Sequence, residues 1–198
     1  KGAYFYPEGS FADLNPKGGY GDWLSIGKKT PPDMLATMYY GHAADLMSEM
    51  ATAIGKPERA MHYQNLAKKI KSAFAAHYLN EETLRLKTDA KAYGDGAGYV
   101  DGKMGFSGNT QTAYANAIFM DFLDDKQKQV AGNHLAQLIH ENDGKLATGF
   151  LGAKQLLPAL SATGHTDLAY QLLLNEEYPS WGIEIKNGAT TIWERWDS

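Results

Sequence analysis

The sequence predicts an all-α fold of antiparallel helix pairs, and three observations favour it. Apolar residues recur at helical spacing in six segments. Turn residues separate the two segments of each pair, and glycine-containing loops precede the pairs. Three αα-hairpins in a row indicate either part of a ring of alternating inner and outer helices or a helical solenoid, and spacing alone leaves both open.

The first pair begins at the segment Thr30–Asp33. Threonine is a good N-cap and proline suits the first helical position, so we expect the helix to start there. Apolar residues continue at helical spacing from Leu35 to Ile54, and Gly55 with Pro57 ends the run. The short connection predicts an antiparallel partner, whose buried face carries Tyr63, Ala67, Ile70 and Phe74.

A glycine-rich stretch at Tyr93–Tyr99 predicts a long loop, and long ordered loops often serve function. Asp89, Asp95 and Asp101 recur nearby but do not match the calcium-loop pattern. The six histidines lack the close pairing that zinc sites use, and no phosphate-binding glycine fingerprint is present. We therefore expect neither a metal nor a cofactor.

The second pair is predicted to start near Thr110, with one helix face formed by Tyr114, Ile118 and Phe122. Asp124 and Gln127 form a capping-box pattern that should open its partner helix. The third pair extends from near Gly149 to Gly164 and then through a helix that carries Leu168, Ala169, Leu172 and Leu173. Pro158 is expected to kink its first helix.

The C-terminal segment has a different pattern, which predicts a β-hairpin. Asn187-Gly188 suits a type I′ turn between candidate strands at 183–186 and 189–193. We therefore interpret residues 1–198 as one helical domain. Residues 1–29 form its N-terminal loop segment, and residues 181–198 form a hairpin segment that contains Glu194.

Composition excludes several classes of function. The formal net charge of −4 gives no basic footprint for nucleic acid. No apolar run approaches the ~20 residues needed to cross a bilayer. The chain has no cysteine, which excludes thiolate chemistry and leaves the compartment undetermined. Aromatic residues make up 12%, and aromatic rings suit sugar faces as well as large cores. Both chain ends, at Lys1 and Ser198, indicate a piece of a longer protein.

Two segments could carry chemistry, Gly21–Leu24 and Thr190–Asp197. Glu194 lies among tryptophans, and such surroundings can tune the pKa of a carboxyl group for acid–base work. The alternative is structural: Glu194 pairs with Arg195 or another cation, and the tryptophans, Trp23 included, fill the core. The residues by themselves leave both readings open.

Six short motifs occur in an order that resembles one enzyme family. The ordered set is similar to the catalytic domain of bacterial α-L-rhamnosidases of glycoside hydrolase family seventy-eight, from about residue 20 to the last residue. The motifs are Gly21–Leu24, Thr110–Ala115, Thr148–Gly152, Asp167–Tyr170, Tyr178–Gly182 and Gly188–Asp197.

The resemblance implies an (α/α)6 toroid, of which this chain would form a partial ring, so that residues 1–198 would be one incomplete catalytic domain with its catalytic base in the segment 181–198. It also implies hydrolysis of terminal α-linked rhamnose with inversion, with Glu194 as the general base. Trp23 would pack against the sugar of a rhamnose-containing glycoside, with Trp181 nearby, and Asp22 and Trp196 are weaker candidates for the same pocket.

Two departures from the family pattern matter. The family's general acid belongs upstream of Gly21–Leu24, but Glu8 and Asp13 lack its motif, and a histidine expected after Glu194 is absent. We therefore expect the 198-residue chain to be inactive by itself, and to self-associate or to pack on other parts of a longer chain. The alternatives are an α/α-toroid hydrolase or lyase acting on another sugar, and a non-catalytic carbohydrate-binding helical scaffold.

Overall fold

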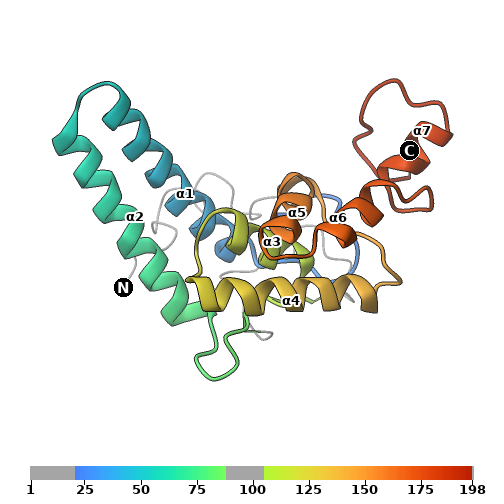
Figure 1. Cartoon of the computed structure of the whole chain (residues 1–198), viewed down its shortest axis with the longest axis horizontal. Helices are drawn as coiled ribbons and strands as arrows, with labels where there is room; N and C mark the ends of the chain where they lie inside the picture. Colours follow the sequence, from blue (N-terminus) through green and yellow to red (C-terminus); the bar gives the residue numbers. More distant parts are fainter. Residues whose placement is uncertain (1–20, 88–104, 198) are drawn as a thin grey trace.

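The computed structural model describes residues 21–87 and 105–197. Apart from two isolated bridges, these residues form helices, turns and loops (Figure 1). The loop predicted at Tyr93–Tyr99, the aspartates Asp89, Asp95 and Asp101, and the acids Glu8 and Asp13 lie outside the described residues. The helices are α1 (Pro32–Ala53), α2 (Pro57–Tyr78), α3 (Gln111–Phe119), α4 (Asp125–Glu141), α5 (Phe150–Ala162), α6 (Thr166–Leu173) and α7 (Trp181–Lys186).

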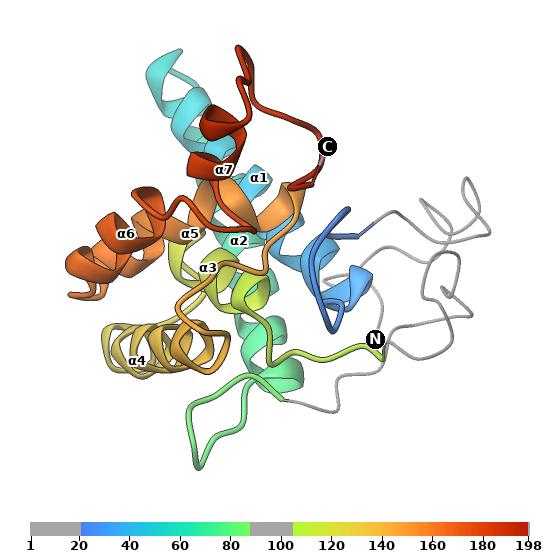
Figure 2. The same cartoon turned by 90° about the vertical axis from the view of Figure 1, so that its right-hand side faces the viewer.

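The first six helices pack as three pairs, α1 with α2, α3 with α4 and α5 with α6. Helix α3 also packs against α1 and α5, so α1, α3 and α5 lie side by side and their partners lie outside them. Figure 2 shows α3 near the centre of this arrangement. The α1–α2 hairpin extends to one side and α7 lies at the other (Figure 1). The three predicted αα-hairpins and the all-α class are confirmed, in the alternating order of inner and outer helices that a toroid requires.

Helices α3 and α4 start at side-chain caps in their local sequence, whereas the cap predicted for α1 does not form. The Thr110 side chain accepts a hydrogen bond from the Ala113 N–H at the start of α3. Asp124 and Gln127 form the predicted capping box of α4. Thr30 does not cap α1, because Pro31 occupies the N-cap position. The Thr30 hydroxyl instead lies 2.6 Å from the Thr110 hydroxyl and links the starts of α1 and α3.

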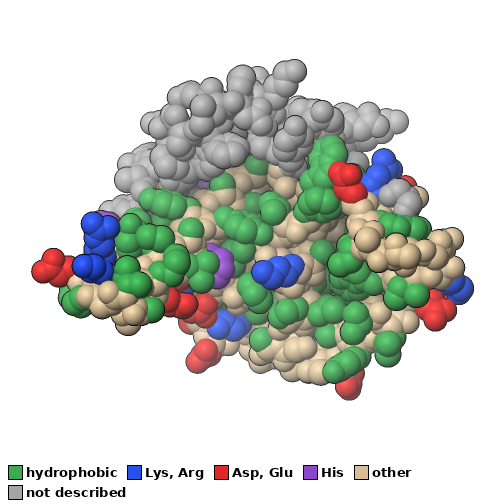
Figure 3. Space-filling model, turned by 90° about the horizontal axis from the view of Figure 1, so that it is seen from above, with side chains coloured by type: hydrophobic (Ala, Val, Ile, Leu, Met, Phe, Trp, Pro, Cys, Tyr) green, Lys and Arg blue, Asp and Glu red, His purple; other side chains and the backbone are tan. Residues whose placement is uncertain are grey.

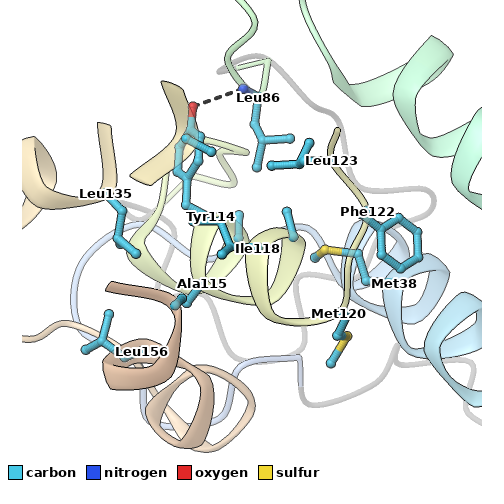
Figure 4. Packing of buried hydrophobic residues seen from close by; sticks show 14 of the residues in the cluster. Met38, Leu86, Tyr114, Ala115, Ile118, Met120, Phe122, Leu123, Leu135 and Leu156 are labelled. Carbon is cyan, nitrogen blue, oxygen red and sulfur yellow. Dashed lines mark hydrogen bonds between the residues drawn. The ribbon is translucent and has the colours of Figure 1, made fainter. Parts of the chain in front are cut away.

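The hydrophobic core is centred on α3, in which every residue except Phe119 is buried. Tyr114 is fully buried, and its hydroxyl accepts a hydrogen bond of 2.9 Å from the Leu86 N–H (Figure 4). Burial raises the pKa of Tyr114 to about 12. Leu135 of α4 and Leu156 of α5 belong to the same cluster. Each large buried side chain of this kind contributes roughly 1.5–3 kcal/mol, so packing on α3 holds the three pairs together.

The β-hairpin predicted at the C-terminus is wrong, because the first candidate strand is helix α7. The Ser180 hydroxyl caps this helix by accepting a hydrogen bond of 3.0 Å from the Ile183 N–H. Asn187-Gly188 ends the helix instead of turning a hairpin: Gly188 has φ +82° and donates to the Ile185 carbonyl, and the Ala189 N–H donates to the Glu184 carbonyl. These two bonds form the Schellman arrangement that a glycine after a helix permits.

Candidate functional site

The loop segment 21–30 joins the N-terminal ends of α1, α3 and α5. The Ile26 N–H donates to the Ala147 carbonyl just before α5, at 2.9 Å. The Ser107 N–H, in the segment leading to α3, donates to the Lys29 carbonyl, also at 2.9 Å. The segments that enter the three inner helices therefore meet at one face of the domain, which we call the junction.

Asp22 is the polar centre of this junction. Its side chain is 2% exposed, and one carboxylate oxygen accepts from the Gly149 N–H at 2.9 Å and from the Thr112 hydroxyl. The other oxygen accepts from the Leu151 N–H at 2.8 Å. Burial raises the pKa of Asp22, against the opposing effect of these hydrogen bonds and of the Lys29 charge. Both oxygens are bonded within the protein, so Asp22 holds the loop to α3 and to the first turn of α5.

Gly149 allows the loop to approach α5 closely. A Cβ atom at Gly149 would lie 2.1 Å from the Trp23 carbonyl oxygen, far inside van der Waals contact. That carbonyl accepts a hydrogen bond of 3.0 Å from the Phe150 N–H. Glycine in the motif Thr148–Gly152 therefore has a steric cause, since any side chain would push the tryptophan loop away.

Two of the predicted site tryptophans, Trp23 and Trp196, are anchored at the start of α5, and the third, Trp181, packs against Trp196. The Trp23 backbone is fixed through Phe150, and its side chain is partly buried. The Trp196 indole N–H donates to the Thr148 carbonyl at 2.9 Å. The Trp181 ring meets the Trp196 ring edge-on, with centroids 5.4 Å apart and an interplanar angle of 79°. The fold thus brings Asp22, Trp23, Trp181 and Trp196 together from opposite ends of the sequence.

Glu194 is exposed and lies two residues before the anchored Trp196. No hydrogen bond or salt bridge within the described part of the chain holds its carboxylate. Arg195 pairs with Asp197 through two contacts of 2.9 and 3.3 Å. Asp197 is the main cause of the raised pKa of Arg195, and Glu194 contributes least. The structural alternative, a Glu194–Arg195 ion pair, is not formed here.

Sequence reasoning missed Glu184, which is 4% exposed on α7. Its carboxylate accepts a hydrogen bond of 3.2 Å from the Trp193 N–H, so it contacts the segment that carries Glu194. In the predicted strand, Glu184 alternates with Ile183 and Ile185 and would face solvent. The missed signal was Ser180, a good N-cap followed by an acid in the next turn, which indicates a helix start.

The described residues contain no group of three or more His, Asp or Glu side chains that could hold a metal ion. Nor is any of their helices both long and apolar enough to cross a membrane. A cleft of about 150 Å³ lies beside the anchored loop. This is smaller than a typical ligand pocket of roughly 300–1,000 Å³. It is lined by Ser25, Ile26, Lys28, Asn109, Thr110, Gln111, Thr112, Leu138, Asn142 and Ala147.

Residues 10–198 match a family described as the bacterial alpha-L-rhamnosidase 6 hairpin glycosidase domain. The alpha-L-rhamnosidase of Streptomyces avermitilis is 42% identical over 185 residues, which cover 93% of this chain and 16% of that protein. The alpha-L-rhamnosidase of Formosa agariphila is 37% identical over 169 residues, or 85% of this chain and 16% of the relative. This chain therefore spans about a sixth of the length of these relatives.

The solved structures that this chain resembles are also those of alpha-L-rhamnosidases. The Streptomyces avermitilis alpha-L-rhamnosidase complexed with L-rhamnose superposes with a TM-score of 0.75 at 42% identity, covering 92% of this chain and 16% of that one. Native alpha-L-rhamnosidase from Aspergillus terreus gives a TM-score of 0.75 at 27% identity, with 90% of this chain and 19% of that one covered.

Proposed function

The chain belongs to the bacterial alpha-L-rhamnosidase six-hairpin glycosidase domain family, and on that basis we propose that it supplies the general base and part of the sugar site of an α-L-rhamnosidase. The proposed base is Glu194. The observation that carries the proposal is the junction at the start of α5. There, the Trp196 indole is bonded to the Thr148 carbonyl and packs against the Trp181 ring. Glu194 lies two residues before Trp196 and is exposed, and no hydrogen bond from the described residues holds its carboxylate.

The chemistry we propose is hydrolysis with inversion. Glu194 removes a proton from a water molecule as the water oxygen bonds to the anomeric carbon, while the bond from that carbon to the leaving oxygen breaks. A general acid gives the leaving oxygen its proton. Room for the water requires the two carboxyl groups to stand roughly 6.5–9.5 Å apart. The resemblance places the acid upstream of Gly21–Leu24, outside the described residues.

The aromatic residues supply the wall on which the sugar packs. We propose that Trp23 contacts the apolar face of a terminal rhamnose, with Trp181 and Trp196 nearby. Aromatic rings suit this role because they present a flat apolar surface. The relative from Streptomyces avermitilis, whose structure contains L-rhamnose, supports rhamnose as the substrate sugar. Asp22 would serve the pocket indirectly, because its oxygens already bind Thr112, Gly149 and Leu151.

We also propose that the 198-residue chain on its own is inactive and self-associates. We expect inactivity because neither Glu8 nor Asp13 carries the motif of the family's general acid. The association follows from exposed apolar side chains on α1 and α2, since such patches promote contact between molecules. Hydrophobic side chains cover much of the face shown in Figure 3. The exposed apolar residues of the α1–α2 hairpin are Leu46, Met47, Met50, Ile54 and Met61.

The test uses the full-length protein and an aryl α-L-rhamnoside. We expect release of the aryl alcohol, with β-L-rhamnose as the first sugar detected by proton NMR before mutarotation. Matched aryl glycosides of other sugars are the control. Turnover of another sugar in preference would favour a different toroid hydrolase, and rhamnose binding without turnover would favour a carbohydrate-binding scaffold. Either result would overturn the proposal, and α-L-rhamnose as first product would overturn inversion.

A further inference from the structure

Helix α7 contacts the Glu194-bearing segment on both sides of that residue. On one side, the Glu184 carboxylate accepts the Trp193 N–H at 3.2 Å. On the other side, the Trp181 ring packs edge-on against the Trp196 ring. The backbone of Glu194 therefore lies between two attachment points on one short helix.

Helix α7 is attached through its first turn. Ser180, which caps it, is fully buried. A Cβ atom at Gly182 would lie 2.2 Å from the Asn175 carbonyl oxygen, so the first turn of α7 packs directly on the preceding loop. Trp196 is fixed in turn to the start of α5 through Thr148. The attachment points thus connect Glu194 to the helical body and to the junction that carries Trp23.

Glu184 is unusual in this arrangement. It is a carboxyl group at 4% exposure, and its side chain accepts a hydrogen bond from the Trp193 N–H. Burying a carboxyl group is costly unless hydrogen bonds compensate.

We propose that Glu184 is a positioning residue that fixes the Trp193–Glu194 backbone and so aims the Glu194 carboxylate. The inference rests on the proposed role of Glu194 as base. A misplacement of about 1 Å can cost ~10²-fold in rate even when it originates away from the reacting atoms. Loss of the Glu184 acceptor should therefore lower kcat and leave sugar binding, which depends on the tryptophans, nearly unchanged.

The experiment compares Glu184→Ala with Glu184→Gln in the full-length protein, using an aryl α-L-rhamnoside. Glutamine keeps an acceptor oxygen for the Trp193 N–H, so we expect its kcat within about threefold of wild type. Alanine should lower kcat by roughly 10- to 100-fold with KM changed less than about threefold. Glu184→Met, which keeps the volume but removes the acceptor, should match alanine and serves if the alanine variant fails to fold.

A double-mutant cycle separates positioning from a general structural effect. In a Glu194→Gln background there is no base to aim, so adding Glu184→Ala should change the residual kcat by less than about threefold. The same fold-loss in both backgrounds, or an unchanged kcat in Glu184→Ala, would overturn the inference. If Glu194→Gln alone retains full activity, the proposed base has failed, and the inference fails with it.

The matched control is Glu176→Ala. Glu176 forms an exposed ion pair with Lys186 of α7, at 3.2 Å, and no hydrogen bond within the described part of the chain joins its side chain to the Trp193–Glu194 backbone. Exposed pairs of this kind contribute little to stability. We expect its kcat and KM to stay within twofold of wild type. A loss equal to that of Glu184→Ala would show that any disturbance of α7 has the same effect, and would overturn the specific role of Glu184.

Discussion

Asp22 and Glu194 are carboxylates attached to the same junction, but their surroundings are opposite. Asp22 is 2% exposed and accepts hydrogen bonds from two backbone N–H groups and one hydroxyl. Glu194 is exposed, and no hydrogen bond or salt bridge from the described residues reaches it. In sequence they look alike, since each is next to a tryptophan.

The difference indicates which carboxylate can do chemistry. A general base needs a free oxygen within hydrogen-bond reach of the water that it activates. The oxygens of Asp22 are already engaged by α3 and α5, whereas those of Glu194 remain open to water. We therefore propose a structural role for Asp22 and proton transfer for Glu194, and the following experiments test that division.

The largest effect should come from Glu194→Gln in the full-length protein. The amide keeps the shape of the side chain but cannot take a proton, and general base catalysis typically contributes ~10²–10⁴-fold. We expect kcat on an aryl α-L-rhamnoside to fall by that factor, with substrate binding mostly retained and the melting temperature unchanged. Glu177→Gln, at another exposed glutamate, is the control. Turnover within threefold of wild type would refute the assignment of Glu194.

The main effect of Asp22→Ala should be a loss of folding stability. The substitution leaves the buried N–H groups of Gly149 and Leu151 without an acceptor, and hydrogen bonds to charged groups contribute about 1.5–3 kcal/mol each. We expect a loss of about 3 kcal/mol, measured as a clear fall in the melting temperature of the full-length protein. Glu81→Ala, in an exposed turn, should change it little. An unchanged melting temperature would contradict the structural role.

Sequence patterns predicted the helical body well because its signals are local. Apolar spacing and caps such as Thr110 and Asp124 depend on residues within one or two turns, and the structure keeps them. The C-terminal segment failed because Asn187-Gly188 fits two structures, a hairpin turn and a helix end. Ser180 decides between them through a cap on Ile183, and burial of Glu184 depends on Trp193, which local pattern cannot reveal.

The candidate site could be predicted only in part for the same reason. Family motifs pointed to Asp22, Trp23, Trp181, Glu194 and Trp196, and the fold attaches three of them, Asp22, Trp23 and Trp196, at the start of α5. Their division of labour depends on contacts between segments far apart in sequence. Asp22 meets Gly149 across the fold, and Trp196 meets Thr148. Whether each touches a sugar stays a prediction.

A smaller effect should follow Trp23→Ala. The backbone of Trp23 is fixed by Phe150 whatever its side chain, so the loop should keep its path. Loss of the ring should weaken rhamnose binding about tenfold, which corresponds to ~1.4 kcal/mol. Titration of the full-length protein with rhamnose measures this, and Trp23→Phe should recover part of the affinity. A large fall in melting temperature with unchanged affinity would show that Trp23 belongs to the core.

The smallest effect concerns the pH dependence of stability through Asp22. Burial raises its pKa above the ordinary 3.8, although hydrogen bonds and Lys29 oppose the shift. A carboxyl group whose pKa is raised by folding binds more protons in the folded state than in the unfolded state. Its contribution to stability is therefore complete below pH 3.8 and is lost as pH rises through the raised pKa.

Asp22→Asn isolates this contribution, because asparagine does not titrate and the other acids of the protein cancel in the comparison. We expect the difference in melting temperature, wild type minus Asp22→Asn, to be largest at the lowest pH measured. This difference should decrease as pH rises above 3.8 and level off once Asp22 is ionised. A difference that instead grows with pH would mean that the donors from Thr112, Gly149 and Leu151 outweigh burial. Asp22 would then be an anion that its hydrogen bonds stabilise.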